Sequence, residues 1–142
     1  NNAASSVIRL EDMGLEPYLI ASSVVGIIAQ RLVRKLCPDC EEVAETTEDE
    51  KQMLGEHVKM VHKAKGCPLC NYTGYRGRMA IHEIIQKDKQ VRKMIQNGAS
   101  SEEIEEYAVA NQGMRTLKEC SLQLVQEGIT TVEELRKIAY YS

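Results

Sequence analysis

The sequence predicts a mixed α/β fold that a bound metal helps to hold together, and three observations lead to this prediction. Two Cys-Pro-X-Cys motifs, "CPDC" at 37–40 and "CPLC" at 67–70, occur in one chain of 142 residues. Short β-branched and apolar segments lie on both sides of them and favour strands. From residue 88 onward, capping residues and apolar residues at helical spacing predict a series of helices.

Composition limits the function classes. The chain has six Tyr but no Phe and no Trp, so its core must be aliphatic. A formal charge of −3 gives no general electrostatic reason to bind nucleic acid. No apolar run approaches the roughly 20 residues that a membrane-spanning helix needs, and no secretion leader is visible. The chain begins with Asn1 rather than Met, so we expect it to be part of a longer protein.

The first 36 residues predict two helices and one ambiguous segment. In "AASSVIRLEDMG" the apolar residues follow helical spacing, and Gly14 is a natural stop. The second helix has Pro17 near its start, where a helix tolerates proline. The segment "IIAQRLVRKL" at 27–36 is compatible with a helix by spacing and with a buried strand by its β-branched content. The residues alone leave both possibilities open.

The paired motifs predict a structural zinc site. Two Cys-X-X-Cys turns supply four sulfurs, which fill the tetrahedral shell that Zn²⁺ prefers and leave no position open for a catalytic water. Pro38 and Pro68 restrict the backbone inside each motif and favour a tight turn. The predicted ligands are the same residue type in both motifs: Cys37, Cys40, Cys67 and Cys70.

Two alternatives to zinc remain weaker. A thioredoxin-like redox site needs one such motif within a βαβ unit, and disulfides are typical of secreted chains. His57 and His62 lie between the motifs and are expected to be surface or half-buried histidines, since four sulfurs already complete the shell. Cys120 shares a helical face with Leu117 and Leu124, so we expect a small buried apolar residue there.

The segment between the motifs is strongly acidic, and its default interpretation is a solvated face. Thr47 with Glu50 forms a capping-box pattern, which predicts a short helix over residues 48–54. The alternation in "HVKMVHKA" at 57–64 predicts a strand that leads into the second motif.

After the second motif, glycines and apolar residues predict a turn and a strand. Gly74 and Gly77 bracket two residues, which suggests a tight turn. Residues 79–85 then predict a mostly buried strand, in which the pair His82–Glu83 is interpreted as structural. Helices follow, with Ser100 and Thr130 as the expected N-caps of two of them.

The sequence lacks several catalytic motifs. It contains no G-x-x-x-x-G-K-[ST] phosphate loop, no G-x-S-x-G and no H-E-x-x-H. From the residues alone the chain is a zinc-stabilised α/β domain with a helical C-terminal part.

Three segments together resemble one family, the ATPases of type II secretion and type IV pilus assembly. They are "RLEDMGLEPYLIASSVVGIIAQRLVRKLCPDC", "GCPLCNYTGYRGRMAIHEII" and "GMRTLKECSLQLVQEGITTVEEL". They occur in the family's order and span nearly the whole chain. Four cysteines followed by G-Y-R-G-R are typical of the secretion and pilus-extension branch, whereas the similar retraction ATPases lack them.

The resemblance implies a fold and a division of the chain. Residues 1–36 would be the end of a RecA-like ATPase domain, with 27–36 as a strand, and residues 76–87 a returning RecA-like strand. Residues 37–75 would be a tetracysteine metal-binding subdomain, and 88–142 a helical C-terminal subdomain. The phosphate loop would lie upstream of Asn1.

The resemblance also implies a function. The parent would be a homohexameric cytoplasmic ATPase that uses ATP and Mg²⁺ and works at the inner membrane through platform proteins of the secretion or pilus system. This chain alone is not expected to hydrolyse ATP. Arg78 could contact the ribose or base edge of the nucleotide, with an exposed structural arginine as the alternative. A second hypothesis is a zinc-stabilised module that docks to the platform proteins, and a third is a nucleic-acid-binding zinc ribbon, which the acidic balance disfavours.

Overall fold

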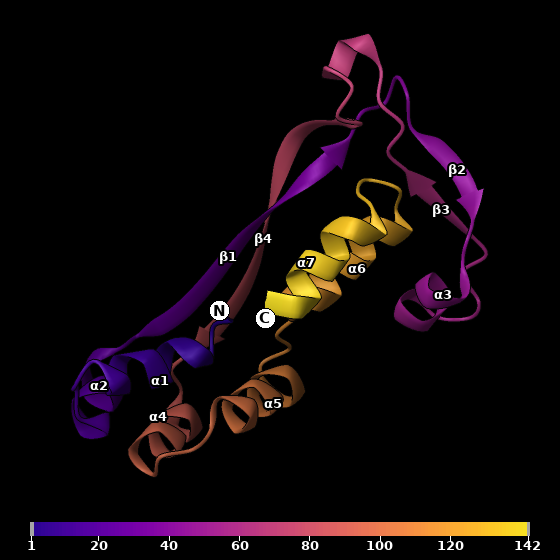
Figure 1. Cartoon of the computed structure of the whole chain (residues 1–142). Coiled ribbons are helices and arrows are strands. Elements are labelled where there is room, and N and C mark those ends of the chain that lie inside the picture. Colours follow the sequence, from indigo (N-terminus) through magenta and orange to yellow (C-terminus); the bar gives the residue numbers. More distant parts are fainter. Residues whose placement is uncertain (1, 142) are drawn as a thin grey trace. The chain divides into compact units, whose positions relative to one another are not determined.

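The computed structural model describes residues 2–141 and confirms the mixed α/β class. Within this range the chain forms seven α-helices, four strands and one 3₁₀ helix. The chain separates into two compact units. The first consists of residues up to Gln30 together with His82–Thr116, and the second of Arg31–Ile81 with the residues from Leu117 onward. Figure 1 labels the elements of both units.

The first unit is mainly helical. It contains α1 (Ser5–Asp12), α2 (Pro17–Ser23), α4 (Lys89–Gln96) and α5 (Ser101–Asn111), which confirms the helices predicted for these parts of the chain. Pro17 is the first residue of α2, as expected. The helices bury aliphatic side chains in one core, whose fully buried members include Val7, Ile85, Val91, Ile95 and Ile104.

The ambiguous segment of the N-terminal region is a strand. β1 (Gly26–Leu36) pairs with β4 (Tyr75–Gln86) in a two-stranded sheet, and each unit contains part of both strands. Ile28 and Leu32 have the spacing of an apolar helical face, but both are exposed on the strand. Their spacing therefore did not mark a buried side.

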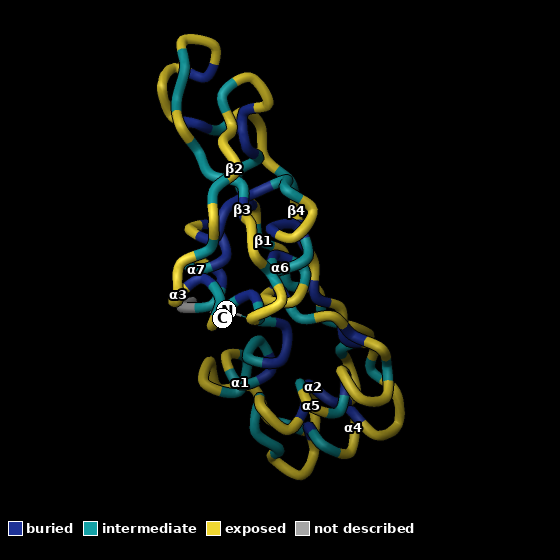
Figure 2. The backbone as a smooth tube through the Cα atoms, turned by 90° about the vertical axis from the view of Figure 1, so that its right-hand side faces the viewer, coloured by how far each residue is buried: buried dark blue, intermediate teal, exposed yellow. Residues whose placement is uncertain are grey.

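Two predictions for β4 were wrong. The strand already begins at Tyr75, so Gly74 and Gly77 do not bracket a turn. Gly77 has φ +80° inside the strand, a conformation that glycine reaches without a Cβ penalty. Burial from residue 79 onward alternates instead of being continuous, because only one face of the strand is covered (Figure 2).

The second unit combines a small sheet with a helical hairpin. β2 (Glu42–Glu45) and β3 (Met60–Lys63) are antiparallel, with Glu42 opposite Lys63. Between them lies α3 (Glu48–Leu54), where both hydrogen bonds of the predicted capping box are present. α6 (Leu117–Gln126) and α7 (Val132–Tyr141) complete the unit. One of its apolar clusters consists of Leu54, Val61, Val125, Val132 and Leu135.

Three details of this unit differ from the sequence analysis. β2 was not predicted, because its glutamates hide the strand within an acidic run. The N-cap of α7 is Thr131, whose hydroxyl accepts the N–H of Glu134 at 3.4 Å, and not Thr130, whose hydroxyl donates to the carbonyl of Arg34 at 2.6 Å. Cys120 is half-buried rather than buried.

Candidate metal centre

The four predicted ligands lie together. The sulfur atoms of Cys37, Cys40, Cys67 and Cys70 are all within 4.8 Å of one another. Three sulfur pairs are each 3.8 Å apart: 37 with 67, 40 with 70, and 67 with 70. The cysteines are free, with Cys37 and Cys70 buried and the other two half-buried.

The spacing of the sulfurs fits a tetrahedral zinc ion. With Zn–S bonds of about 2.3 Å, the sulfurs of an ideal tetrahedron lie about 3.8 Å apart. A disulfide would need a distance of about 2.0 Å. The donor set is sulfur only, which suits a soft, closed structural site and leaves no coordination position for a substrate or water.

Each motif forms a compact turn, which we call the first Cys loop (37–40) and the second Cys loop (67–70). In the second loop the 3₁₀ helix Pro68–Cys70 turns the chain, and the N–H of Tyr72 returns to the carbonyl of Cys67 at 2.8 Å. Asn71 and Tyr72 both have positive φ, at 55° and 63°. Asn adopts such values readily, but they are uncommon for a bulky residue such as Tyr72, whose conformation the surrounding bonds must maintain.

Backbone N–H groups surround the sulfurs. Gly66 donates to the Cys40 sulfur at 3.4 Å, and both Cys67 and Gly74 donate to the Cys70 sulfur at 3.2 Å. Such bonds stabilise thiolates, the form in which cysteine binds metal. Backbone N–H groups thus provide hydrogen-bond donors to two of the four sulfurs.

Two of the cysteines, Cys40 and Cys70, differ in thiol acidity. Desolvation raises the pKa of the Cys70 thiol, but hydrogen bonds from the N–H groups of Cys67 and Gly74 outweigh it and lower that pKa to about 6. Desolvation raises the pKa of the Cys40 thiol to about 12, despite the N–H of Gly66. Cys70 therefore ionises more readily than Cys40, and a metal must displace the protons that remain on the cysteines as it binds.

Sequence reasoning missed the importance of two glycines. A Cβ at Gly66 would lie 2.8 Å from the carbonyl oxygen of Tyr72, and one at Gly74 would lie 2.5 Å from the Cβ of Ala64. Both glycines also have positive φ, at 105° and 83°. The useful pattern was visible in "GCPLCNYTG", where a glycine precedes the second motif and another follows its last cysteine by four residues.

The other candidate side chains lie outside the cluster. His57 is exposed and His62 is half-buried, as expected, with Nδ1 of His62 3.5 Å from a Glu41 oxygen. Arg78 is exposed on β4, and within residues 2–141 its guanidinium has no hydrogen-bonded partner. Arg76 pairs instead with Asp39 of the first Cys loop at 3.1 Å.

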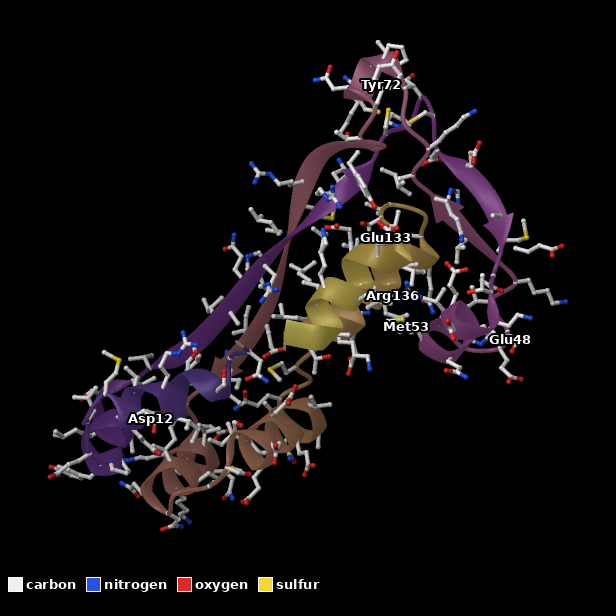
Figure 3. The ribbon with its side chains drawn as sticks, in the orientation of Figure 1. Asp12, Glu48, Met53, Tyr72, Glu133 and Arg136 are labelled. Carbon is white, nitrogen blue, oxygen red and sulfur yellow. The ribbon has the colours of Figure 1, made fainter. Side chains whose placement is uncertain are left out.

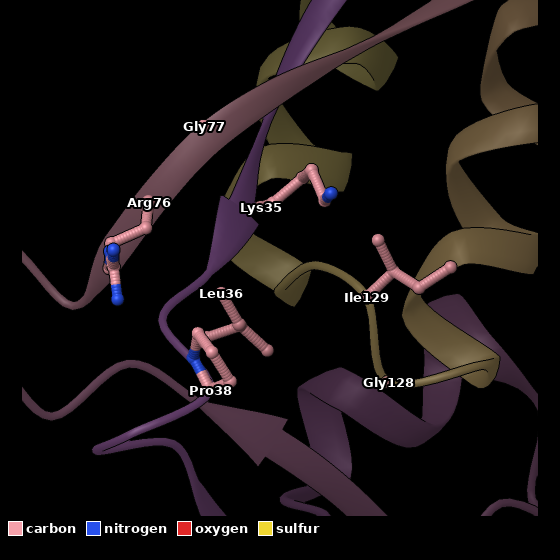
Figure 4. Close-up of a pocket in the computed structure, with 7 residues that line it drawn as sticks. All are labelled: Lys35, Leu36, Pro38, Arg76, Gly77, Gly128 and Ile129. Atoms are coloured by element: carbon pink, nitrogen blue, oxygen red, sulfur yellow. The ribbon is translucent and has the colours of Figure 1, made fainter.

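A cavity of about 620 Å³ adjoins the first Cys loop (Figure 4). It is lined by residues of this loop, of β1 and β4, and of the α6–α7 connection. Its charged groups are Lys35 and Arg76. In Figure 4 these two side chains point away from each other, so they do not converge on one anion. The cavity therefore does not have the arrangement of a phosphate-binding site.

The chain matches known proteins along nearly its whole length. A family profile described as "Type II/IV secretion system protein" covers residues 1–137. The chain is 39% identical to "Type II secretion system ATPase E" of Vibrio cholerae, over 97% of this chain and 28% of that protein. It is also 39% identical to "Type IV pilus assembly ATPase PilB" of Thermus thermophilus, over 95% of this chain and 16% of that protein. The chain thus spans about a quarter or less of the length of these relatives.

Proposed function

The chain belongs to the family of type II/IV secretion system proteins, and from this membership we propose that it is the C-terminal part of an ATPase that powers type II secretion or type IV pilus assembly. The observation that carries the proposal is the match over residues 1–137, together with relatives that are named as ATPases of both systems. The order of the three segments quoted above also supports it.

In this proposal the divisions of the chain have separate roles. Residues 1–36 and 76–87 would complete a RecA-like domain whose phosphate loop lies elsewhere in the whole protein. Residues 37–75 would be the metal-binding subdomain, since they contain all four clustered cysteines. Residues 88–142 would be the helical subdomain. The whole protein would act as a cytoplasmic homohexamer with ATP and Mg²⁺, held at the inner membrane by platform proteins. Within residues 2–141, none of the helices combines the length and apolar character that a bilayer crossing requires.

Turnover measurements test the ATPase proposal. The sequence has no phosphate loop, so the chain alone should not hydrolyse ATP, because catalysis of phosphoryl transfer depends on groups that position the phosphates and Mg²⁺. The same chain joined to the upstream part of its protein should hydrolyse ATP. Turnover by the isolated chain, or none by the joined protein with Mg²⁺ present, would contradict the proposal.

Zinc is the metal that the cluster fits best, and when bound it would cross-link the two Cys loops. Replacing Cys37 with Ser should abolish stoichiometric zinc in elemental analysis of the purified chain, because it removes a buried ligand sulfur. The matched control is Cys120→Ala, which removes a thiol outside the cluster. Equal zinc content in the wild type and in Cys37→Ser would remove the cluster as the metal site.

Arg78 remains our candidate for a nucleotide contact. Its exposure and its unpartnered guanidinium support this role, since a planar guanidinium can bond ribose or phosphate oxygens. In the whole protein Arg78→Ala should raise the KM for ATP, whereas Arg92→Ala, at an exposed arginine of α4, should not. An unchanged KM in Arg78→Ala would contradict the nucleotide contact and show that Arg78 is an exposed structural arginine.

A second function, docking to platform proteins, has one supporting observation. Leu69 and Tyr72 are 67% and 73% exposed on and beside the second Cys loop, and Figure 3 shows Tyr72 at its outer end. Exposed large apolar side chains that lie together are candidates for a binding surface, and the positive φ of Tyr72 is a conformation that clusters at ligand-binding segments. Replacing both with Ser should weaken binding to the platform proteins without lowering zinc content. Unchanged binding would exclude this surface.

A further inference from the structure

The α6–α7 connection is bonded directly to the end of β1. The N–H of Leu36 donates to the carbonyl of Ile129 at 2.9 Å, and the hydroxyl of Thr130 donates to the carbonyl of Arg34 at 2.6 Å. The N–H of Arg34 donates to one oxygen of Glu134 at 2.9 Å, and its guanidinium donates to the other oxygen at 2.9 and 3.0 Å. Residues 129–134 thus bind both backbone groups of Arg34 and the N–H of Leu36, near the end of β1.

In the Arg34–Glu134 ion pair, the glutamate is buried and the arginine is partly exposed. The Glu134 side chain is only 5% exposed. Burial raises the pKa of Glu134, but the hydrogen bonds from the backbone and side chain of Arg34 outweigh it and hold the pKa below its usual value. Lys137 of α7 also binds this carboxylate, at 3.0 Å, but Arg34 is the partner that joins it to β1. Breaking a buried ion pair is destabilising, so the docking of α7 depends on Arg34 staying in place.

Tyr75 connects this contact to β4. Its ring lies 3.9 Å from the guanidinium carbon of Arg34, which is the geometry of a cation–π contact. Its hydroxyl is 2.8 Å from the hydroxyl of Thr131, the N-cap of α7. One aromatic side chain therefore fixes both the arginine of β1 and the start of α7.

Two of the residues that hold the hairpin lie next to residues of the metal site. Leu36 directly precedes Cys37, and Tyr75 directly follows Gly74. Gly74 donates its N–H to the Cys70 sulfur at 3.2 Å and accepts the N–H of Cys37 at 2.9 Å. Backbone hydrogen bonds therefore connect the two Cys loops directly to Leu36 and Tyr75, which contact the hairpin. All of these residues belong to the second unit.

We infer that metal binding at the four cysteines and docking of the α6–α7 hairpin onto β1 are coupled, with Arg34, Tyr75 and Glu134 as positioning residues for the metal. The inference rests on the proposed zinc site. A metal that fixes Cys37 and Gly74 also fixes Leu36 and Tyr75, and so the groups that receive α7. Because coupling between two equilibria is reciprocal, loosening the hairpin must weaken metal binding by the same factor by which metal loss loosens the hairpin.

The experiment measures zinc affinity and hairpin opening in the same 142-residue chain. Zinc affinity comes from competition with a chromophoric chelator, and opening of the hairpin from hydrogen exchange of the amides of α7. The variants are Glu134→Gln, which keeps the shape but removes the charge, and Tyr75→Phe, which removes only the hydroxyl. The control is Lys59→Ala, at an exposed residue of the second unit that lies outside both Cys loops and outside the hairpin.

We expect both variants to bind zinc at least about fivefold more weakly than the wild type, whereas Lys59→Ala does not. We also expect zinc removal from the wild type to speed exchange in α7, a result that needs no variant to fold. Zinc bound with unchanged affinity in both variants, or α7 exchange that is insensitive to zinc, overturns the coupling alone. A wild-type chain that binds no zinc overturns the metal proposal, and the coupling with it.

Discussion

Gly74 and Gly77 are three residues apart and share nearly the same backbone conformation, with φ of +83° and +80°, but they differ in surroundings. A Cβ at Gly74 would meet the side chain of Ala64 at 2.5 Å, whereas one at Gly77 would have its nearest neighbour at an ordinary 4.0 Å. The pair therefore separates the cost of the backbone conformation from the cost of close packing beside the metal site.

Gly74→Ala should destabilise the chain by about 2–4 kcal/mol, since a left-handed alanine and an overpacked contact both contribute. Gly77→Ala should cost only about 1 kcal/mol, from the backbone alone. Urea unfolding followed by circular dichroism measures both. Only Gly74→Ala should also lower zinc affinity, because the clash with Ala64 would displace the backbone N–H that donates to the Cys70 sulfur. Equal losses in the two variants would contradict the close packing described above.

At the level of elements, Asp88 joins the end of β4 to α4 and α5. Its carboxylate caps α4 by accepting the N–H of Val91 at 2.8 Å, and it accepts the hydroxyl of Tyr107 of α5 at 2.6 Å. The hydrogen bond from Tyr107, followed by that from Val91, holds the pKa of Asp88 below its ordinary value. The charged carboxylate is therefore the form that stabilises this corner of the first unit.

The sign of the pH effect follows from that lowered pKa. The stabilisation is fully present above the pKa of an unfolded Asp, about 3.9, and is lost as the pH falls through the lower pKa of the folded state. Asp88→Asn keeps a capping side chain but no charge. Hydrogen exchange of the α4 amides should therefore be faster in Asp88→Asn than in the wild type at pH 5, after correction for intrinsic rates, and the difference should shrink toward pH 3.

Tyr107→Phe provides the matched control for this prediction. It leaves the carboxylate of Asp88 and its cap on α4 intact but removes the group that lowers its pKa most. The stabilisation by Asp88 should then disappear at a higher pH than in the wild type. A difference between Asp88→Asn and the wild type that does not depend on pH would show that the cap works through shape alone.

Local patterns in the sequence were enough to predict most elements, and they singled out the four cysteines that cluster in the structure. The capping box of Thr47 and Glu50 placed α3 correctly, because its signal is contained within four residues. The repeated Cys-Pro-X-Cys motif also indicated which four cysteines would lie together, and their role as metal ligands stays a prediction. β2 escaped prediction because its pairing with β3, and not its own composition, makes it a strand. The ion pair of Arg34 with Glu134 was also invisible, since 100 residues separate its partners and neither lies in a motif.

At the scale of the whole molecule, the two units have separate aliphatic cores. In the first, Ile104 is fully buried among residues of the helices and strand ends. In the second, Leu135 is 1% exposed in a core with Val61 and Val125, and this unit also contains the four cysteines. Because all four clustered cysteines belong to the second unit, a metal bound there would cross-link this unit in addition to its aliphatic core.

We therefore expect metal removal to act on one unit more than on the other. Chelation should speed hydrogen exchange at Val61 and Leu135, whereas exchange at Val91 and Ile104 should change little, because no cysteine of the cluster lies in the first unit. Ile104→Ala is the reciprocal control: it should destabilise the first unit by about 2–4 kcal/mol through a cavity and leave zinc content at one ion per chain. If chelation instead released the amides of both units together, the chain would unfold as one cooperative body, and the metal would stabilise the first core as well as the second.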